Sequence, residues 1–299
     1  MQGIIIENIS NLYKVKVIDR NGIAEIYEAT ARGKFKQEEI TPVVGDKVKI
    51  EIIDEENNKA VIEEINNREV YVKRPKLANI TQIVFVVSSK DPKPDLLMLD
   101  KQLAFAEFLG IKAVIVLNKT DLDEEKEFKH IKDVYEKIGY RVIETQAKEK
   151  NGIEELKQEL KDNINAFSGN SGVGKSTLIN AIFKEDITQE GEISKKNKRG
   201  KNTTTSIKLY EIDKDTYIAD TPGFSTFEIS EIESKELYKY FLDFKDEVNN
   251  CEFVGCTHIK EENCGIKEAM KLGKITEERY VRFCKIYEEL KQKEERKKW

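Results

Sequence analysis

The chain has 299 residues, of which 36% are charged, and its formal net charge is −5. This length allows two or three domains, and the negative charge argues against a protein that binds polyanions through bulk charge. The longest apolar runs, at 83–87 and 113–117, have the length of buried strands and are too short to span a bilayer.

Residues 1–72 are predicted to form a small β-barrel. Five short alternating segments are separated by turn signals such as Asn21-Gly22, and no convincing helix interrupts them. The expected strands cover residues 3–9, 12–19, 22–29, 46–53 and 59–65. Five short strands are typical of an OB-fold. An SH3-like barrel is the alternative, because strand count alone does not separate the two.

Residues 73–228 alternate between strand and helix patterns, which predicts a mostly parallel sheet with helices on both faces. The expected strands cover 80–88, 112–117, 140–145, 164–169 and 216–220, and the expected helices cover 94–110, 124–139, 153–163 and a segment opening at 177. Residues 229–299 are predicted to be helical around a group of cysteines, with a last amphipathic helix near 276–295. The start of the chain lacks the basic and apolar regions of a signal peptide, so we expect a cytoplasmic protein.

The segment after the strand at 164–169 matches the phosphate-binding pattern G-x-x-x-x-G-K-[ST]. Its residues, and the expected phosphate ligands, are Gly169, Asn170, Ser171, Gly172, Val173, Gly174, Lys175 and Ser176, followed by Thr177. Glycines let backbone N–H groups turn towards phosphate oxygens, Lys175 reaches the β- and γ-phosphates, and the Ser176 hydroxyl binds Mg²⁺. A plain glycine turn between strand and helix is the weaker interpretation of this full match.

Asp220 to Gly223 form a D-x-x-G sequence at the end of a predicted strand. Asp220 is a candidate for holding Mg²⁺ through a water molecule, and the Gly223 N–H can contact a γ-phosphate. The pattern is weak alone, but about fifty residues after a phosphate loop it supports a nucleotide hydrolase.

Asn118, Lys119 and Asp121 form an N-K-x-D sequence after a strand, which selects guanine. The Asp121 carboxylate can accept from guanine N1–H and the 2-amino group, and the Lys119 stem can pack over the ring. On its own this sequence could also form a helix N-cap turn, but beside the two other motifs guanine recognition is the better interpretation. Ala147 and Lys148 follow the next strand, where a main-chain amide would meet guanine O6.

The guanine motif precedes the phosphate loop, which reverses the usual order in a GTPase. The termini of compact α/β domains often lie close together, so joining them and cutting elsewhere preserves the core. We therefore infer a circular permutation. One consequence is that the segment after Asp220, which would sense the γ-phosphate, leads directly into the C-terminal segment.

All four cysteines lie beyond residue 250, and in a cytosolic chain such a cluster favours metal binding over disulfides. Cys284 stands apart and is interpreted as an ordinary buried cysteine. His130 lies in a charged helix and is interpreted as a surface residue. The basic run 194–201 holds five cations in eight residues, a pattern that by itself also fits solvated surface.

With this motif order, the chain resembles the RsgA (YjeQ/YloQ) family of circularly permuted GTPases that depend on the small ribosomal subunit. The resemblance implies an OB-fold, a permuted GTPase domain and a zinc-binding helical domain that act late in small-subunit maturation. It also implies one structural zinc ion bound by Cys251, Cys256, His258 and Cys264, because three thiolates and one imidazole form a closed tetrahedral set.

The chain departs from the family in its first switch, where the family has G-R-H-T-T and this chain has Gly200 to Thr204 with Asn202 in place of the histidine. Phe224 also stands where many GTPases place a water-orienting glutamine. An amide can orient a water molecule but cannot take its proton at neutral pH. Thr204 is the expected switch ligand of Mg²⁺, with Thr203 and Thr205 as alternatives.

The expected activity is hydrolysis of GTP to GDP, with Lys175, Asn202, Thr204 and Gly223 as catalytic candidates and Mg²⁺ as cofactor. The expected partner is the small ribosomal subunit with its rRNA. The protein is expected to be a monomer and to have no membrane partner. A GTP-gated RNA-binding module with negligible turnover is the first alternative, favoured by Asn202 and Phe224. A permuted GTPase of large-subunit assembly is the second, and the barrel and cysteine cluster argue against it.

Overall fold

The computed structural model of the chain describes residues 1–18, 22–33, 35, 40–124, 127–186, 207–220 and 229–297. Its backbone separates into two compact units. The first unit comprises Met1–Ile83, Ile153–Phe167 and Ser176–Phe224, and the second comprises Val84–Gly152, Ser168–Lys175 and Ser225–Trp299. The domain boundaries after residues 72 and 228 stay predictions.

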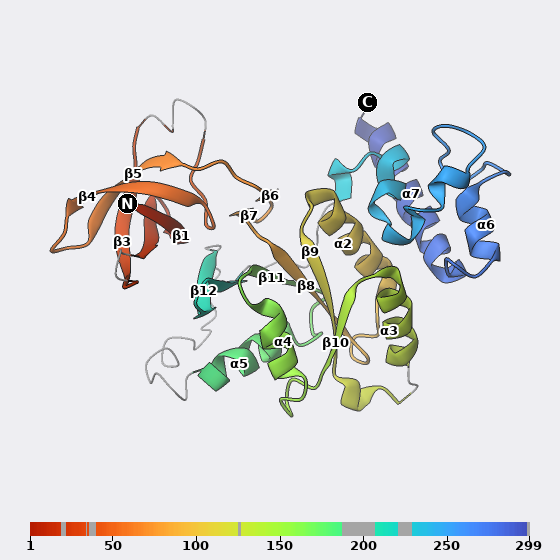
Figure 1. The fold of residues 1–299 in the computed structure, drawn as a ribbon, viewed down its shortest axis with the longest axis horizontal. Helices are drawn as coiled ribbons and strands as arrows, with labels where there is room; N and C mark the ends of the chain where they lie inside the picture. The colour runs from red at the N-terminus through yellow and green to blue at the C-terminus, as the bar shows by residue number, and fades with distance from the viewer. Residues whose placement is uncertain are drawn as a thin grey trace. The chain divides into compact units, whose positions relative to one another are not determined.

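The first unit opens with a closed five-stranded barrel (Figure 1). Its strands are β1 (Gln2–Ile9), β2 (Leu12–Ile18), β3 (Ala24–Ala31), β4 (Lys47–Asp54) and β5 (Lys59–Ile65). Neighbours pair in the order β1-β2-β3-β5-β4, β4 closes onto β1, and only the β3–β5 pair is parallel. This closed Greek-key order is that of an OB-fold, as predicted, and not that of an SH3-like barrel.

Strand alternation builds the barrel core, because successive side chains point to opposite faces. On β2, Tyr13, Val15 and Val17 are buried inside the barrel. Lys16 belongs to the opposite face, yet it is only 7% exposed. Its ammonium donates to Glu211 and to the Tyr217 hydroxyl, at 3.3 Å for the latter. The outer face of β2 is therefore covered by a second element of the same unit.

That element is a hairpin of β12 (Lys208–Asp213) and β13 (Thr216–Asp220), which pair antiparallel. β12 was not predicted from the sequence; it also pairs with β1 and so extends the barrel sheet. The first unit also contains the short hairpin β6 (Tyr71–Lys73) and β7 (Lys76–Ala78), helix α4 (Ile153–Leu160), strand β11 (Ile164–Ser168) up to Phe167 and most of helix α5 (Lys175–Asp186). β13 runs parallel to β11, which places their carboxyl ends at one edge.

The second unit holds a parallel sheet and its helices (Figure 1). Strand β8 (Gln82–Ser88) begins in the first unit, where Gln82 donates to Asn165 at 2.9 Å, and continues into the second. There it neighbours β9 (Lys112–Asn118), which pairs with β10 (Arg141–Thr145). The connecting helices are α2 (Leu96–Leu109) and α3 (Glu127–Ile138). The strands predicted near 80–88, 112–117 and 140–145 are thereby confirmed.

The C-terminal part of the second unit combines 3₁₀ turns with two helices, α6 (Gly265–Lys271) and α7 (Glu277–Lys297). α7 confirms the amphipathic helix predicted near 276–295. Phe241, Phe244 and Phe283 form the aromatic core here, with ring centroids 4.8–5.2 Å apart. Aliphatic side chains from the same segment, among them Leu237, Ile266 and Ile286, are buried as well.

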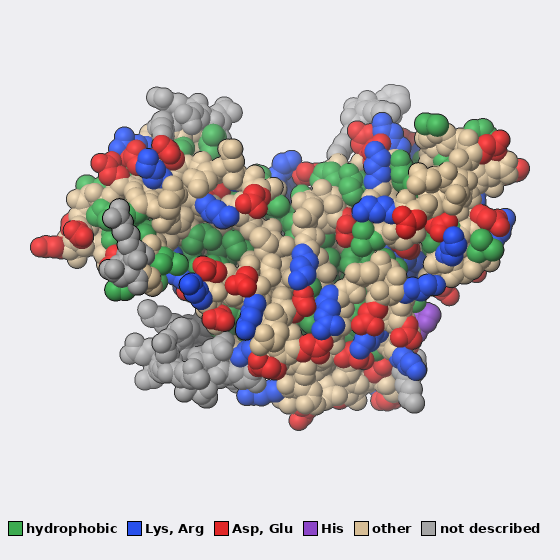
Figure 2. Space-filling view, viewed as in Figure 1, with side chains coloured by type: hydrophobic (Ala, Val, Ile, Leu, Met, Phe, Trp, Pro, Cys, Tyr) green, Lys and Arg blue, Asp and Glu red, His purple; other side chains and the backbone are tan. Residues whose placement is uncertain are grey.

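Across the described ranges, none of the helices combines the length and apolar character needed to cross a membrane. The face in Figure 2 shows Lys and Arg side chains interspersed with Asp and Glu side chains over the described residues. A mixed surface of this kind does not attract polyanions by its bulk charge, so recognition of a nucleic acid would use local surfaces.

Candidate functional site

The phosphate loop, Gly169–Gly174, lies between β11 and α5 and has a backbone that requires glycine. Gly169 and Gly174 have φ angles of 141° and 99°. A Cβ atom would lie 2.3 Å from the Val86 carbonyl oxygen at Gly169 and 2.3 Å from Asn118 Nδ2 at Gly174. Any side chain at these two positions would therefore clash with a buried strand or with Asn118.

Lys175 follows the loop as the first residue of α5. Its ammonium donates to the carbonyl oxygens of Gly169 at 2.5 Å and Asn170 at 2.9 Å, so it lies inside the curve of the loop. Burial lowers the pKa of Lys175 from its ordinary value. A half-buried cation surrounded by loop backbone is suited to bind phosphate oxygens. Their negative charge would stabilise the ammonium form of Lys175. Ser171, Ser176 and Thr177 are exposed beside it.

Asn118 connects its own guanine motif to two other segments of the predicted site, the phosphate loop and residues 145–147. Its Nδ2 donates to the Val173 carbonyl oxygen in the phosphate loop at 2.9 Å. Its Oδ1 accepts from the Thr145 hydroxyl at 3.0 Å and from the Ala147 N–H at 3.3 Å. The side chain is 1% exposed. Asn118 is thus a buried bracket that positions the ligand-binding segments around it.

The remaining guanine candidates lie around this bracket. Lys119 has a φ of 64° and donates to the carbonyl oxygens of Lys90 at 3.2 Å and Asp91 at 2.6 Å. Asp121 is exposed in the 3₁₀ turn that follows, and Lys148 is exposed in the loop after β10. The Ala147 N–H donates to Asn118. Contacts of Asp121, Ala147 and Lys148 with a base stay predictions.

Of the predicted magnesium ligands, the structure describes Ser176 and Asp220 but not Thr204. Asp220 ends β13, and the pairing of Ala166 with Ala219 places it beside the end of β11, from which the phosphate loop departs. Asn202, Thr203, Thr204, Thr205, Gly223 and Phe224 lie outside the described residues. Their roles in catalysis and in binding Mg²⁺ stay predictions.

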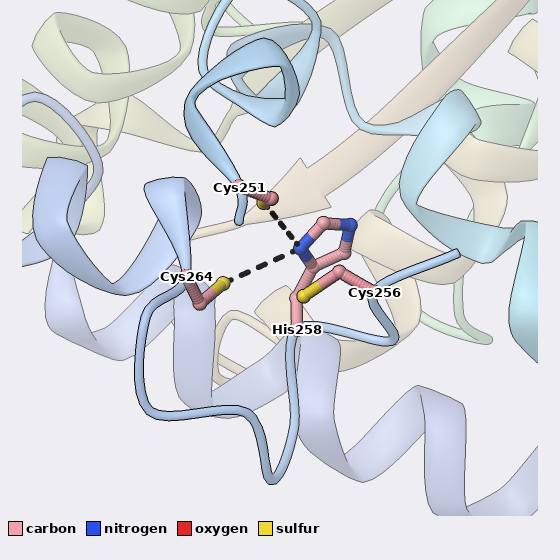
Figure 3. Close-up of side chains that lie close together, drawn as sticks. All are labelled: Cys251, Cys256, His258 and Cys264. Atoms are coloured by element: carbon pink, nitrogen blue, oxygen red, sulfur yellow. Dashed lines mark hydrogen bonds between the residues drawn. The ribbon is translucent and has the colours of Figure 1, made fainter. Parts of the chain in front are cut away.

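The predicted zinc ligands form a compact cluster (Figure 3). The ligand atoms of Cys251, Cys256, His258 and Cys264 all lie within 4.8 Å of one another. His258 Nδ1 lies 3.5 Å from Cys251 Sγ and 3.4 Å from Cys264 Sγ. A tetrahedral zinc site with Zn–S distances of about 2.3 Å has S–S edges of about 3.8 Å, so this donor set fits Zn²⁺.

The chemistry of the cluster also favours a cation. Burial raises the pKa of Cys256 to about 12 and that of Cys264 above its ordinary value, and it lowers the pKa of His258. Three thiols held this close cannot all ionise without a positive charge among them. Cys251 Sγ also accepts from the Gly265 N–H at 3.3 Å.

Glu261 shapes the loop that carries His258. Its carboxylate accepts from the Thr257 N–H at 2.9 Å and from the Ile259 N–H at 3.1 Å. Burial opposes ionisation of Glu261, but these N–H donors outweigh it and lower its pKa to about 2. Glu261 was not among the site residues predicted from the sequence. The sequence does carry a signal for it, because an acidic side chain lies between the closely spaced ligand candidates His258 and Cys264. Several N–H groups in such a short loop need an acceptor.

Comparisons with known proteins agree with this geometry. Residues 63–230 match the family model described as RsgA GTPase, and residues 2–62 match the one described as RsgA N-terminal domain. The chain is 38% identical over 290 residues to the small ribosomal subunit biogenesis GTPase RsgA of Alkaliphilus metalliredigens, covering 97% of this chain and 98% of the relative. It is 39% identical over 299 residues to the protein of that name from Clostridium botulinum strain Hall, covering 100% of both.

Two solved structures are similar over nearly the whole chain. The crystal structure of YjeQ from Thermotoga maritima has a TM-score of 0.83 at 36% identity, covering 97% of this chain and 98% of that one. The crystal structure of YloQ, a circularly permuted GTPase, has a TM-score of 0.82 at 30% identity, covering 98% and 95%. The chain therefore belongs to the RsgA family of circularly permuted GTPases.

Proposed function

We propose that this chain hydrolyses GTP on the small ribosomal subunit during late maturation and that hydrolysis times its release. The observation that carries the proposal is the Asn118 bracket, which joins the guanine motif, the 145–147 loop and the phosphate loop despite their permuted order. The names of the relatives, small ribosomal subunit biogenesis GTPases, supply the partner.

Within this proposal each part of the site has a separate task. Asp121 selects guanine, while the loop N–H groups and Lys175 bind phosphates and stabilise charge on the transferred group. Mg²⁺, when bound, would neutralise negative charge on the phosphates. Ser176, Thr204 and Asp220 are the residues that would hold it.

The zinc site would be structural, because its four protein ligands leave no open position for a substrate. Cys251, Cys256, His258 and Cys264 would hold one Zn²⁺, which would add a cross-link to the C-terminal segment. We further propose that the protein acts as a monomer in the cytoplasm and contacts rRNA through local surfaces.

One observation favours a second candidate function. Asn202 replaces the family histidine, and Phe224 stands in the position of a water-orienting glutamine. A chain without either group could bind GTP and rRNA and yet turn over negligibly, acting as a GTP-gated binding module. A role in large-subunit assembly is disfavoured by the barrel and the cysteine cluster.

Multiple-turnover release of phosphate from GTP tests these alternatives. It is measured for the protein alone, with purified small subunits, and with purified large subunits at matched concentrations. We expect slow release alone and stimulation by small subunits only. Negligible turnover under all three conditions, with GTP-dependent binding to small subunits, would establish the binding module. Stimulation by large subunits alone would establish the large-subunit role.

A further inference from the structure

Helix α2 lies between the nucleotide site and the metal-bearing C-terminal segment, and it is buried on more than one side. Seven of its 14 residues are buried, including the polar side chains of Asp100 and Gln102. The helix packs against β9, against the turn Ser234–Tyr240 and against α7. Positions two apart on a helix are separated by about 200°. Asp100 and Gln102 therefore point to nearly opposite sides of α2.

On one side, α2 contacts the phosphate loop. Gln102 Nε2 donates to Ser168 Oγ at 3.0 Å, and both side chains are buried. Ser168 immediately precedes Gly169, the first residue of the loop. Asp95, which caps α2 by accepting from the Met98 N–H at 2.9 Å, also lies 3.5 Å from the Asn170 amide. The position of α2 is thus linked to the position of the loop.

On the other side, Asp100 fixes α7 against α2. Its carboxylate accepts from Arg279, from Arg282 Nε at 2.5 Å and from the Tyr135 hydroxyl at 2.6 Å. The Asp100 side chain is 0% exposed and that of Arg279 is 2% exposed. Arg279 also donates to Asp243 at 2.8 Å. Moving α7 away would leave buried charges unpaired, so α7 and α2 are expected to move together.

α7 in turn contacts the metal centre. The Tyr280 hydroxyl donates to the carbonyl oxygen of the metal-ligand candidate His258 at 2.7 Å, and Tyr280 directly follows Arg279. Neighbouring residues of one helix therefore contact the metal loop and α2. All of these contacts lie within the second unit, so they form one continuous series from the metal loop to the phosphate loop.

We propose that α2 couples the metal-bearing C-terminal segment to the phosphate loop, with Asp100 and Gln102 as positioning residues for nucleotide binding. This coupling depends on the proposed function, because it presupposes that the loop holds nucleotide phosphates. Coupling between two sites is reciprocal. A partner that binds the C-terminal segment and displaces α7 would therefore change nucleotide affinity, and the nucleotide would change the affinity for that partner by the same factor.

The test measures the dissociation rate of a fluorescent GDP from the full-length, zinc-loaded protein. Gln102→Met keeps the volume of the side chain but removes the donor to Ser168, and Arg282→Met removes one donor to Asp100 at a partly exposed position. We expect each to speed dissociation by roughly three- to tenfold. Lys285→Met, at an exposed position on α7, is the matched control and should leave the rate unchanged. Arg282→Lys, which keeps the charge, should restore most of the wild-type rate.

The double variant Gln102→Met with Arg282→Met decides whether the two contacts act together. We expect the combined effect on the rate to be smaller than the product of the single effects, since both act through α2. Multiplicative effects, or an Arg282→Met rate equal to that of Lys285→Met, would overturn the coupling. If Arg282→Met does not fold, Lys101→Met replaces it, because Lys101 pairs with Glu289 between α2 and α7. Failure of the wild type to bind GDP would instead refute the proposed function.

Discussion

The side-chain amide of Asn118 donates to the main-chain carbonyl of Val173 at 2.9 Å, although 55 residues separate the two in the chain. In the permuted order the guanine motif precedes the phosphate loop, so this bond connects the end of β9 to a loop that follows it in the chain. The bond therefore holds the guanine motif against the phosphate loop.

Asn118→Asp tests the bracket directly. The carboxylate can still accept from Thr145 and Ala147, but it cannot donate to Val173 and places a charge against that carbonyl oxygen. We expect the free energy of unfolding to fall by about 1–3 kcal/mol, and GDP affinity to fall as well. Urea unfolding and GDP titration measure the two effects. Asn249→Asp, at an exposed position, is the control, and equal behaviour of both variants would show that the bracket is unimportant.

Asp121→Asn tests base selection. The change replaces a group that only accepts hydrogen bonds by one that also donates, so guanine loses an acceptor while the 2-oxo group of xanthine gains a donor. We expect preference to shift from GDP towards xanthosine diphosphate. Competition binding measures the shift, with Asp133→Asn on the exposed face of α3 as the control. Wild-type protein that binds ADP as tightly as GDP would contradict the assignment of the base.

Chelation tests the metal centre. We expect one zinc ion per chain, measured by elemental analysis, and a loss of helix content and a lower melting temperature when a chelator removes it. Cys256→Ser should lose the ion because it removes one of the four donors. Cys284→Ser should retain the ion, since Cys284 lies outside the cluster. Unchanged melting after complete removal of zinc would show that the cluster does not stabilise the fold.

The parts of the site that were predictable from sequence are those that depend on neighbouring residues. The phosphate loop, its flanking strand and helix, and the cysteine spacing each occupy a short stretch with a distinctive pattern. The Asn118 bracket was not predictable in detail, because its partners lie 27 to 55 residues away. β12 was missed because a six-residue strand offers little periodicity.

Contacts between residues still farther apart in the chain were harder to predict from the sequence. Arg279 pairs with Asp100 across 179 residues, and arginine in a charged C-terminal helix reads as a surface residue. A signal does exist in the partner helix, where Asp100 and Gln102 stand in a mostly apolar sequence and are themselves buried. A buried polar residue needs a partner, so such a residue predicts a long-range contact without identifying it.

Substitutions in the basic run 194–201 test nucleotide-timed docking. This run lies outside the described residues. Replacing Lys195, Lys196, Lys198 and Arg199 with serine should weaken binding to small subunits and flatten its salt dependence. GTP affinity of the free protein should stay nearly unchanged. Co-sedimentation over a salt series measures the effect, with a control variant that replaces the exposed lysines Lys112, Lys129, Lys161 and Lys214.

The wild type supplies the second part of that experiment. If switch residues order around the γ-phosphate, binding to small subunits should be tighter with a non-hydrolysable GTP analogue than with GDP. Equal binding of the two forms at moderate salt would contradict nucleotide-timed release. Equal losses in the two lysine variants would show that docking depends on total charge and not on this run.

Asn202→His tests which residue handles the attacking water. Asn202 also lies outside the described residues, and its place in the chain corresponds to the family histidine. An imidazole titrates near neutral pH and can accept a proton, whereas an amide can only orient the water. General-base catalysis contributes about 10²–10⁴-fold to rates, so even a partly aligned histidine should raise single-turnover GTP hydrolysis measurably. Asn202→Gln, which keeps an amide, is the matched control and should not raise the rate. A rate that stays at the wild-type level in Asn202→His, with GTP affinity intact, would mean that another residue orients the water.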